Sequence, residues 1–181
     1  HSMNRFIPKD YWENRLNELF GLHGVGYRGL SKNYNKWLYK IKRSVFLQNI
    51  ESIDLDCLKA KVLDVGCGTG FYIERWKKLN AHKIVGIDIT NCSVDNLSQK
   101  YPDIEFHQVD IGDNIQKLPT NNFDAISCFD VLYHIVDDTQ FETAISNIYS
   151  LLKPGGLFIW SDNFLRHKKL SDSHQVSRTL N

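Results

Sequence analysis

Apolar residues follow two different spacings along the chain, and the change comes near residue 60. Before that point they recur every three or four residues, the spacing of amphipathic helices that each bury one stripe. The first stripe, in a helix over residues 8–20, consists of Trp12, Leu16, Leu19 and Phe20. The second stripe, in a helix capped by Ser31, consists of Tyr34, Leu38, Ile41 and Val45.

After residue 60, short continuous apolar runs alternate with helical patterns. Such runs are typical of parallel strands that are covered on both faces. We therefore predict an α/β fold with a Rossmann-like, doubly wound parallel sheet and right-handed crossovers. The strands are expected at residues 61–65, 83–88, 104–109, 123–129 and 157–161. The helices are expected at 71–79, 92–100 and 138–152, the last of them ended by a turn at Lys153-Pro154-Gly155-Gly156.

These patterns divide the chain into three parts. Residues 1–3 resemble a tag remnant, residues 4–59 form a helical lid, and residues 60–181 form the core. Hydrophobic residues make up 42% and charged residues 24% of the chain, as in ordinary globular domains. No apolar run reaches the length of a membrane span and no signal peptide follows Met3, so we expect no membrane partner. Four cysteines without a CxxC pair indicate reduced thiols and a cytoplasmic protein.

Charge is uneven although the net charge is only +1. The first 43 residues carry nine Lys or Arg against three Asp or Glu, with aromatic residues between them. This segment is compatible with binding nucleic acid or an acidic substrate. It is equally typical of amphipathic helices whose charges are solvated, which is the interpretation that we favour.

The most informative segment is a glycine-rich turn between a strand and a helix, Asp64-Val65-Gly66-Cys67-Gly68-Thr69-Gly70. A turn of this kind lets the backbone approach a ligand closely. Phe71 stands where a dinucleotide-binding motif needs its third glycine, which argues against NAD. No Gly-Lys-Ser/Thr follows, so the phosphate-binding loop of nucleotide hydrolases is excluded as well.

The turn resembles motif I of the class I S-adenosylmethionine-dependent methyltransferases, in particular the small-molecule branch with domains of type 11 or 25. Asp88 ends the second strand and Asp110 ends the third, where that family places two acids. Residues 123–134 resemble its fourth motif, and residues 151–157 resemble its turn into strand five. The likeness covers about residues 60 to 165, with five motifs in the family's order.

The resemblance implies a sheet of order 3-2-1-4-5 and S-adenosylmethionine as cofactor, with S-adenosylhomocysteine as its product. In the family, the acid at Asp88 binds both ribose hydroxyls and the acid at Asp110 contacts the adenine amino group. The glycines let the backbone approach the methionine portion. The cofactor-binding residues so implied are Asp64, Gly66, Cys67, Gly68, Gly70, Asp88, Ile89, Asp110, Ile111 and Phe129.

Methyl transfer is an in-line displacement that depends on alignment and desolvation of the acceptor. For a hydroxyl acceptor, His134 is the candidate general base, because it follows strand four and its ordinary pKa is about 6.5. The alternative is a histidine that packs against the lid or caps a carbonyl. A catechol-type magnesium site of Asp130, Asp162 and Asn163 is a further alternative. We expect no metal, because metal-free members of the family also carry an acid at the position of Asp130.

The acceptor is expected to be a small molecule or a sugar methylated at oxygen. No Asn/Asp-Pro-Pro-aromatic motif follows strand four, which argues against methylation of nucleic-acid bases at N6. The residues expected to enclose the acceptor are Tyr11, Trp12, Tyr27 and Tyr34. Alternative functions are a non-catalytic cofactor-binding module of a larger enzyme, a nucleic-acid methyltransferase that uses the basic lid, and, more remotely, an NAD-linked reductase.

The chain departs from the family at its C-terminus. The family's sheet has seven strands, whereas strands 6 and 7 have no counterpart in the expected pattern, and residues 176–180 resemble the start of the helix that would precede them. We expect either a fragment of a longer enzyme or a short form. In the short form, a second copy in a homodimer or a further domain would cover the open sheet edge.

Overall fold

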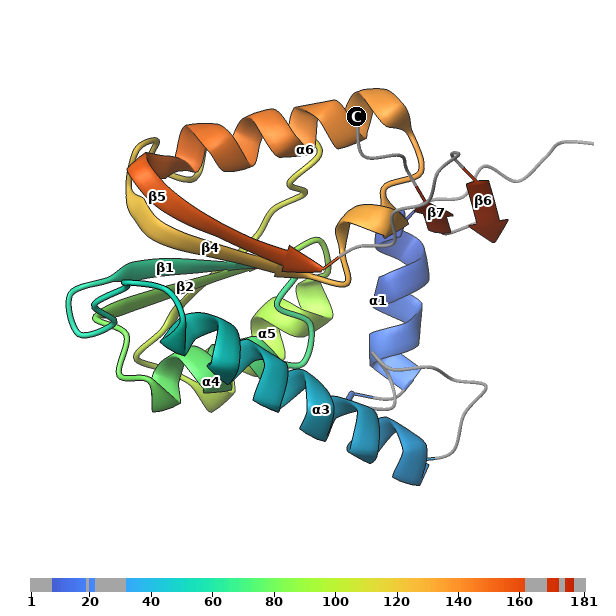
Figure 1. The fold of residues 1–181 in the computed structure, drawn as a ribbon. Coiled ribbons are helices and arrows are strands. Elements are labelled where there is room, and N and C mark those ends of the chain that lie inside the picture. The colour runs from blue at the N-terminus through green and yellow to red at the C-terminus, as the bar shows by residue number, and fades with distance from the viewer. Residues whose placement is uncertain (1–7, 19, 22–31, 162–168, 173–174, 178–181) are drawn as a thin grey trace, which may run out of the picture.

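A five-stranded parallel sheet forms the centre of the protein in a computed structural model (Figure 1). The structure describes residues 8–18, 20–21, 32–161, 169–172 and 175–177. The sheet order is β3-β2-β1-β4-β5, which confirms the predicted order. The strands are β1 (Lys61–Val65), β2 (Lys83–Asp88), β3 (Glu105–Gln108), β4 (Phe123–Phe129) and β5 (Leu152–Ser161).

Helices cover both faces of this sheet (Figure 1). One face carries α3 (Lys32–Glu51), α4 (Phe71–Lys78) and α5 (Asn91–Lys100), and the other carries α6 (Asp138–Leu151). Successive side chains of a strand point to opposite faces, so each strand supplies both cores. In β1, Leu63 belongs to the core under α6, whereas Val62 belongs to the core under α3, α4 and α5.

Helix α3 buries a different face from the one predicted. Its buried residues are Asn35, Tyr39, Phe46 and Ile50. The Phe46 ring packs edge-on against Trp76 of α4 at a centroid distance of 5.1 Å. The predicted stripe is wrong: Leu38 is half-buried, and Tyr34, Ile41 and Val45 are exposed. The helix carries two apolar stripes, and the aromatic surface of α4 decides which one is covered. Ser31, the predicted cap, lies outside the described residues.

Helix α1 (Pro8–Glu18) lies beyond the carboxyl ends of the strands (Figure 1). Of its predicted stripe, Leu16 is buried and Trp12 is half-buried. Phe20, which lies beyond the end of the helix, is 37% exposed, and Leu19 lies outside the described residues. None of the helices that the structure describes combines the length and apolar character needed to cross a bilayer.

The C-terminal part differs from expectation at two points. Strand β5 already begins at Leu152, five residues earlier than predicted. Its register against β4 shifts between Leu152 and Leu157, so residues 153–156, the predicted turn, form an irregular segment within the strand. Gly155 adopts φ +76° there. Val176 lies in β7 (Gln175–Ser177), which pairs antiparallel with β6 (Lys169–Asp172), so the predicted helix start is wrong. β-Branched Val176 suits a hairpin strand opposite Leu170.

A buried hydrogen-bonded relay fastens α4 to the centre of the sheet. The Trp76 indole N–H donates to Ser127 Oγ at 2.9 Å, and the Ser127 hydroxyl donates to Asp64 Oδ1 at 2.7 Å. All three residues are buried. Burial raises the pKa of Asp64 to about 7, although the hydrogen bond from Ser127 opposes that shift. The carboxylate at the end of β1 is therefore costly to ionise.

This cost predicts how stability depends on pH. The pKa of Asp64 in the folded state lies above its ordinary value of 3.8, so the native state holds the proton more tightly than the unfolded chain. The contribution of Asp64 to stability is therefore complete below pH 4 and declines as the pH rises towards 7. Asp64→Asn should remove this decline. Relative to the parent chain, the variant should gain on the order of 4 kcal/mol in free energy of unfolding between pH 4 and pH 8.

Urea unfolding at both pH values measures this gain. Asp103→Asn is the matched control, because the Asp103 side chain is 66% exposed and its substitution should leave the pH profile unchanged. A profile for Asp64→Asn that parallels the parent's would contradict the prediction.

Candidate active site

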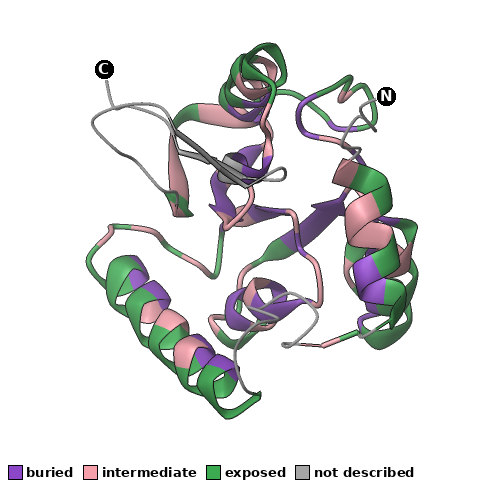
Figure 2. Ribbon diagram, turned by 90° about the vertical axis from the view of Figure 1, so that its right-hand side faces the viewer, coloured by how far each residue is buried: buried purple, intermediate pink, exposed green. Residues whose placement is uncertain are grey.

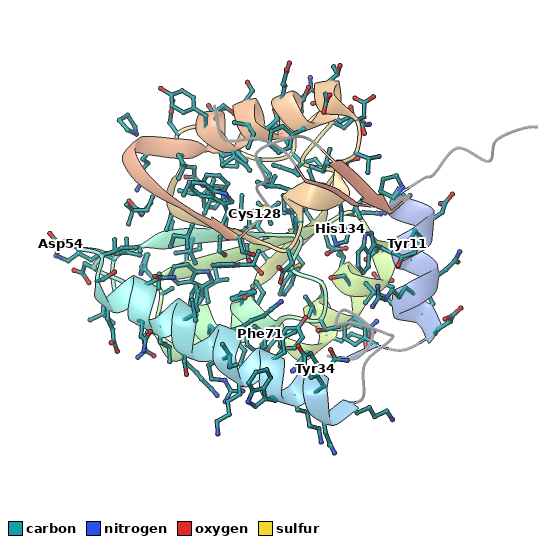
Figure 3. All side chains as sticks on the ribbon, turned by 45° about the vertical axis from the view of Figure 1, so that its right-hand side comes forward. Tyr11, Tyr34, Asp54, Phe71, Cys128 and His134 are labelled. Carbon is teal, nitrogen blue, oxygen red and sulfur yellow. The ribbon has the colours of Figure 1, made fainter. Side chains whose placement is uncertain are left out.

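The glycine loop, the two predicted acids and His134 converge on one edge of the sheet, because all five strands are parallel and end on the same side. The glycine loop follows β1, Asp88 ends β2, and Asp110 follows β3. His134 lies in a short 3-10 helix, η1 (Leu132–His134), beyond β4. Figure 3 shows His134 beside Tyr11 of α1, so the lid helix faces this edge.

The glycine loop is held against the end of β2 and against the segment that follows β4. The N–H groups of Gly66 and Cys67 both donate to the Ile87 carbonyl, at 2.8 and 3.0 Å. Gly66 has φ +69°, and a Cβ built on it would lie 2.3 Å from Val131 Cγ2. Any other residue would push Val131 away, so glycine at this position lets the loop approach the β4 end. Gly68 and Gly70 also adopt positive φ values of 51° and 87°.

Asp88 is buried and accepts three hydrogen bonds. Its Oδ2 accepts from Gly68 N–H at 2.9 Å, while its Oδ1 accepts from the Thr90 N–H at 2.9 Å and the Thr90 hydroxyl at 2.7 Å. Burial raises the pKa of Asp88, and these bonds oppose the rise. A carboxylate oxygen accepts about two bonds, so Oδ2 keeps one acceptor position for a ligand hydroxyl.

Asp110 is the second carboxylate of this edge. It is half-buried, and its Oδ1 accepts from the Gly112 N–H at 2.8 Å. Burial raises its pKa. Of its neighbours, Ile111 turns its side chain into the core under α6, and Ile89 accepts a hydrogen bond from Gln108 at its carbonyl. These two residues therefore position the backbone beside the acids.

Two further predicted cofactor residues are engaged in packing. The Cys67 side chain lies in the core under α3, α4 and α5, where burial raises the pKa of its thiol. All four cysteines have free thiols in this structure. The Phe129 ring stacks on Tyr72 at a centroid distance of 4.2 Å. Asp64, which lies directly below the loop, is engaged with Ser127.

Asp130 joins three elements at the end of β4. Its Oδ2 pairs with the Lys42 ammonium of α3, and its Oδ1 accepts from the Ser161 hydroxyl of β5 at 3.2 Å. The Asp130 N–H donates to the same Ser161 oxygen at 3.1 Å. Asp130 adopts φ +58°, a left-handed conformation that Asp tolerates better than most residues. A half-buried ion pair therefore lies at the carboxyl end of β4.

Sequence reasoning missed Glu13, which docks α1 onto the site. The Glu13 carboxylate accepts from the Asn91 and Cys92 N–H groups, both at 2.7 Å. These are the first N–H groups of α5, whose first turn contains no acid of its own. An anion is favourable there because the helix N-terminus carries partial positive charge. No local pattern shows a cap that comes from a helix 78 residues away.

The same helix covers His134. The Trp12 ring lies edge-on to the imidazole at a centroid distance of 4.9 Å, and the Tyr11 ring contacts Trp12 at 5.1 Å. His134 is only 9% exposed. The Arg15 guanidinium lies 5.1 Å from the Trp12 ring on the same helix. Helix α1 thus contacts both the start of α5, through Glu13, and His134, through Trp12.

Some predicted residues are not part of this arrangement. Tyr34 lies on α3, is 42% exposed and packs on Trp37, well apart from Tyr11 and His134 (Figure 3). Tyr27, Asp162 and Asn163 lie outside the described residues. Among the residues that the structure does describe, no group of three or more His, Cys, Asp or Glu side chains is placed to hold a metal ion.

The donor and acceptor pattern of this edge fits an adenosine. Asp88 and Asp110 offer carboxylate oxygens at the ends of neighbouring strands, and a ribose and an adenine amino group offer the matching donors. The loop shows no Lys that would favour a pyrophosphate, and its Gly68 N–H is already used by Asp88. The residues present therefore suit the cofactor that the resemblance implies.

Comparison with known proteins agrees with this geometry. A family model described as a methyltransferase domain matches residues 62–156. The malonyl-[acyl-carrier protein] O-methyltransferase of Buchnera aphidicola is 25% identical over 174 residues, which cover 93% of this chain and 62% of that protein. A ubiquinone biosynthesis O-methyltransferase of Actinobacillus pleuropneumoniae is 34% identical over 109 residues, 56% of this chain and 44% of that protein.

A solved structure described as a DhpI-SAM-HEP complex has a TM-score of 0.63 at 19% identity, and the match covers 94% of this chain and 80% of that one. This likeness shows the shared fold. Both curated relatives are matched over less than two thirds of their own length. The family model, in contrast, matches more than half of this chain and includes the glycine loop, Asp88 and Asp110. The chain therefore belongs to the methyltransferase-domain family.

Proposed function

We propose that this protein is an S-adenosylmethionine-dependent methyltransferase acting at oxygen on a small molecule or a saccharide. The observation that carries the proposal is the joint placement of the glycine loop, Asp88, Asp110 and His134 at one sheet edge beneath α1. Family membership supports the class of reaction. When bound, S-adenosylmethionine would supply a methyl group made electrophilic by its sulfonium sulfur.

The protein's part on the cofactor side is to bind and orient. Asp88 would accept hydrogen bonds from the two ribose hydroxyls. One hydroxyl would use the free acceptor position of Oδ2, and the second would replace the Gly68 N–H at the same oxygen. Asp110 would accept from the adenine amino group. Glu13 holds the start of α5, and thereby the residues next to Asp88, in place.

The protein's part on the acceptor side is to exclude water and to take a proton. Trp12 covers His134, so an acceptor hydroxyl beside the imidazole would be shielded from solvent. His134 would remove the hydroxyl proton as the oxygen attacks the methyl group. Lys42 and Asp130 provide polar groups of both signs that would orient the acceptor.

Oxygen is favoured as the acceptor atom because two relatives of this chain are named as O-methyltransferases. A cofactor-binding module is the second candidate, because the family model matches the part that carries the glycine loop, Asp88 and Asp110 and does not include α1, which would cover an acceptor. Binding of S-adenosylhomocysteine without turnover across an acceptor panel would support the module.

Replacing Asp88 should weaken the cofactor site. Asp88→Asn keeps the size of the side chain but loses the charge that strengthens each hydrogen bond to it. We expect S-adenosylhomocysteine to bind about tenfold to a hundredfold more weakly, measured by titration calorimetry. Asp103→Asn, an exposed change elsewhere on the surface, is the control. Equal affinities of Asp88→Asn and the parent chain would overturn the cofactor assignment.

Releasing α1 from α5 should affect the same site. Glu13→Ala removes both charge-assisted hydrogen bonds to the N-terminus of α5. We expect S-adenosylhomocysteine to dissociate roughly tenfold faster, as measured by stopped-flow fluorescence, because the lid is docked less firmly. Asp10→Ala, an exposed change on the same helix, should leave the rate near the parent's. An unchanged rate in Glu13→Ala would mean that α1 does not retain the cofactor.

Removing the candidate base should affect turnover more than binding. His134→Ala should lower kcat at least about tenfold, within the range for a lost general base. The affinity for S-adenosylhomocysteine should stay within about twofold of the parent's, since Asp88 and Asp110 are untouched. His134→Gln tests packing separately, because it fills the space beside Trp12 without acting as a base. Turnover restored by His134→Gln would assign His134 a packing role.

A further inference from the structure

The outer side of α3 carries an apolar stripe that no described element covers. Its members are spaced by three or four residues, so they line one side of the helix. They are Tyr34 (42% exposed), Trp37 (56%), Ile41 (40%) and Val45 (49%). In Figure 2, α3 is the long helix at the lower left, with exposed residues along its outer side and buried ones towards the protein. We call these four residues the outer stripe.

Positive charge adjoins the outer stripe. Lys36 and Lys40 are exposed and follow Trp37 around the helix, with Lys40 the nearer of the two. Arg43 lies further round, on the side of Arg75 of α4. Over its whole length α3 carries five basic residues and a single acid, Glu51 at its last position. The helix thus carries a net charge of +4, whereas the total for all 181 residues is only +1.

We propose that this face of α3 binds the surface of an anionic phospholipid bilayer. A helix that combines an apolar side containing Trp with Lys and Arg beside it is suited to the boundary between headgroups and acyl chains. Trp37 and Tyr34 would lie at the headgroup level, where amphipathic rings are favoured. Lys40, and Lys36 beyond it, would reach the lipid phosphates with their long side chains.

The outer stripe favours a bilayer over other anionic partners. Nucleic-acid affinity comes mainly from phosphate contacts, which would leave the four apolar side chains in water. A second copy of this chain would bring Lys36 and Lys40 near their own counterparts in a symmetric pairing, which like charges oppose. A bilayer would bury the apolar side chains of the outer stripe and also supply phosphates for the basic residues beside it. The expectation of no membrane partner rested on the lack of an apolar run of spanning length in the sequence, and binding at a bilayer surface does not need such a run.

The bound orientation would connect the bilayer with the site edge. Lys42 lies on the same helix and pairs with Asp130 at the end of β4, while Tyr39 and Phe46 pack on α4. Binding through the outer stripe would therefore hold the acceptor side of the protein close to the lipid surface. This inference does not depend on the proposed function, because vesicle binding is measured without cofactor or acceptor.

The test is sedimentation of the 181-residue chain with vesicles. We expect binding to vesicles containing one quarter phosphatidylglycerol, little binding to pure phosphatidylcholine, and weakening at 0.5 M salt. Lys36→Gln combined with Lys40→Gln should lower the partition coefficient roughly thirtyfold. Trp37→Ser should also lower it at least about fivefold. Trp37 emission should shift to shorter wavelength on binding, and Trp37→Phe should abolish that shift while binding persists.

Matched controls lie on α6, at the opposite face of the sheet. Tyr149 is 80% exposed, so Tyr149→Ser removes an exposed aromatic ring and should leave binding unchanged. Circular dichroism of each variant confirms folding. Failure to sediment with anionic vesicles at low salt would overturn the proposal, as would equal losses in Trp37→Ser and Tyr149→Ser. Dimerisation that Trp37→Ser abolishes, or oligonucleotide binding in place of vesicle binding, would assign the face to those partners instead.

Discussion

The site depends most on the buried carboxylate of Asp88. Taking a carboxylate out of water is costly unless donors surround it, and here Gly68 and Thr90 supply three hydrogen bonds. Those bonds join the glycine loop, the end of β2 and the N-cap of α5 at a single charged group. The loop can approach this group because glycine permits the left-handed backbone at Gly66 and Gly68. A ligand that meets Asp88 therefore meets a preformed arrangement.

A second carboxylate extends this arrangement to the lid. Glu13 reaches α5 from α1, and its negative charge adds to the effect of burial in raising the pKa of Asp88. Two acids close to one another are tolerated because each has N–H donors of its own. The consequence is a mechanical connection between the Asp88 side of the edge and α1. Since Trp12 on the same helix covers His134, the docking of α1 affects both Asp88 and His134.

Helix α3 serves the protein through two opposite faces. Its inner face packs Tyr39 and Phe46 onto the aromatic residues of α4, and Lys42 reaches the end of β4. Its outer face leaves Trp37 and Ile41 exposed beside basic residues. Among the described residues, none covers the outer stripe. The β4 end and the candidate membrane surface therefore both contact α3.

The sequence by itself determined the succession of strands and helices, the glycine loop and the two strand-end acids, whereas the order of the strands in the sheet was implied by the family resemblance. The former features are local: continuous apolar runs, glycines at a turn and an acid after each strand are readable without knowledge of distant contacts. The tertiary structure alone decided which stripe of α3 is buried, because both stripes have helical spacing and only the surface of α4 distinguishes them. It also decided that Glu13 caps α5 and that Trp12 covers His134, since these contacts join residues far apart in the chain. The spacing of apolar residues shows which sides of a helix can be buried. Which other elements it packs against depends on how the layers come together.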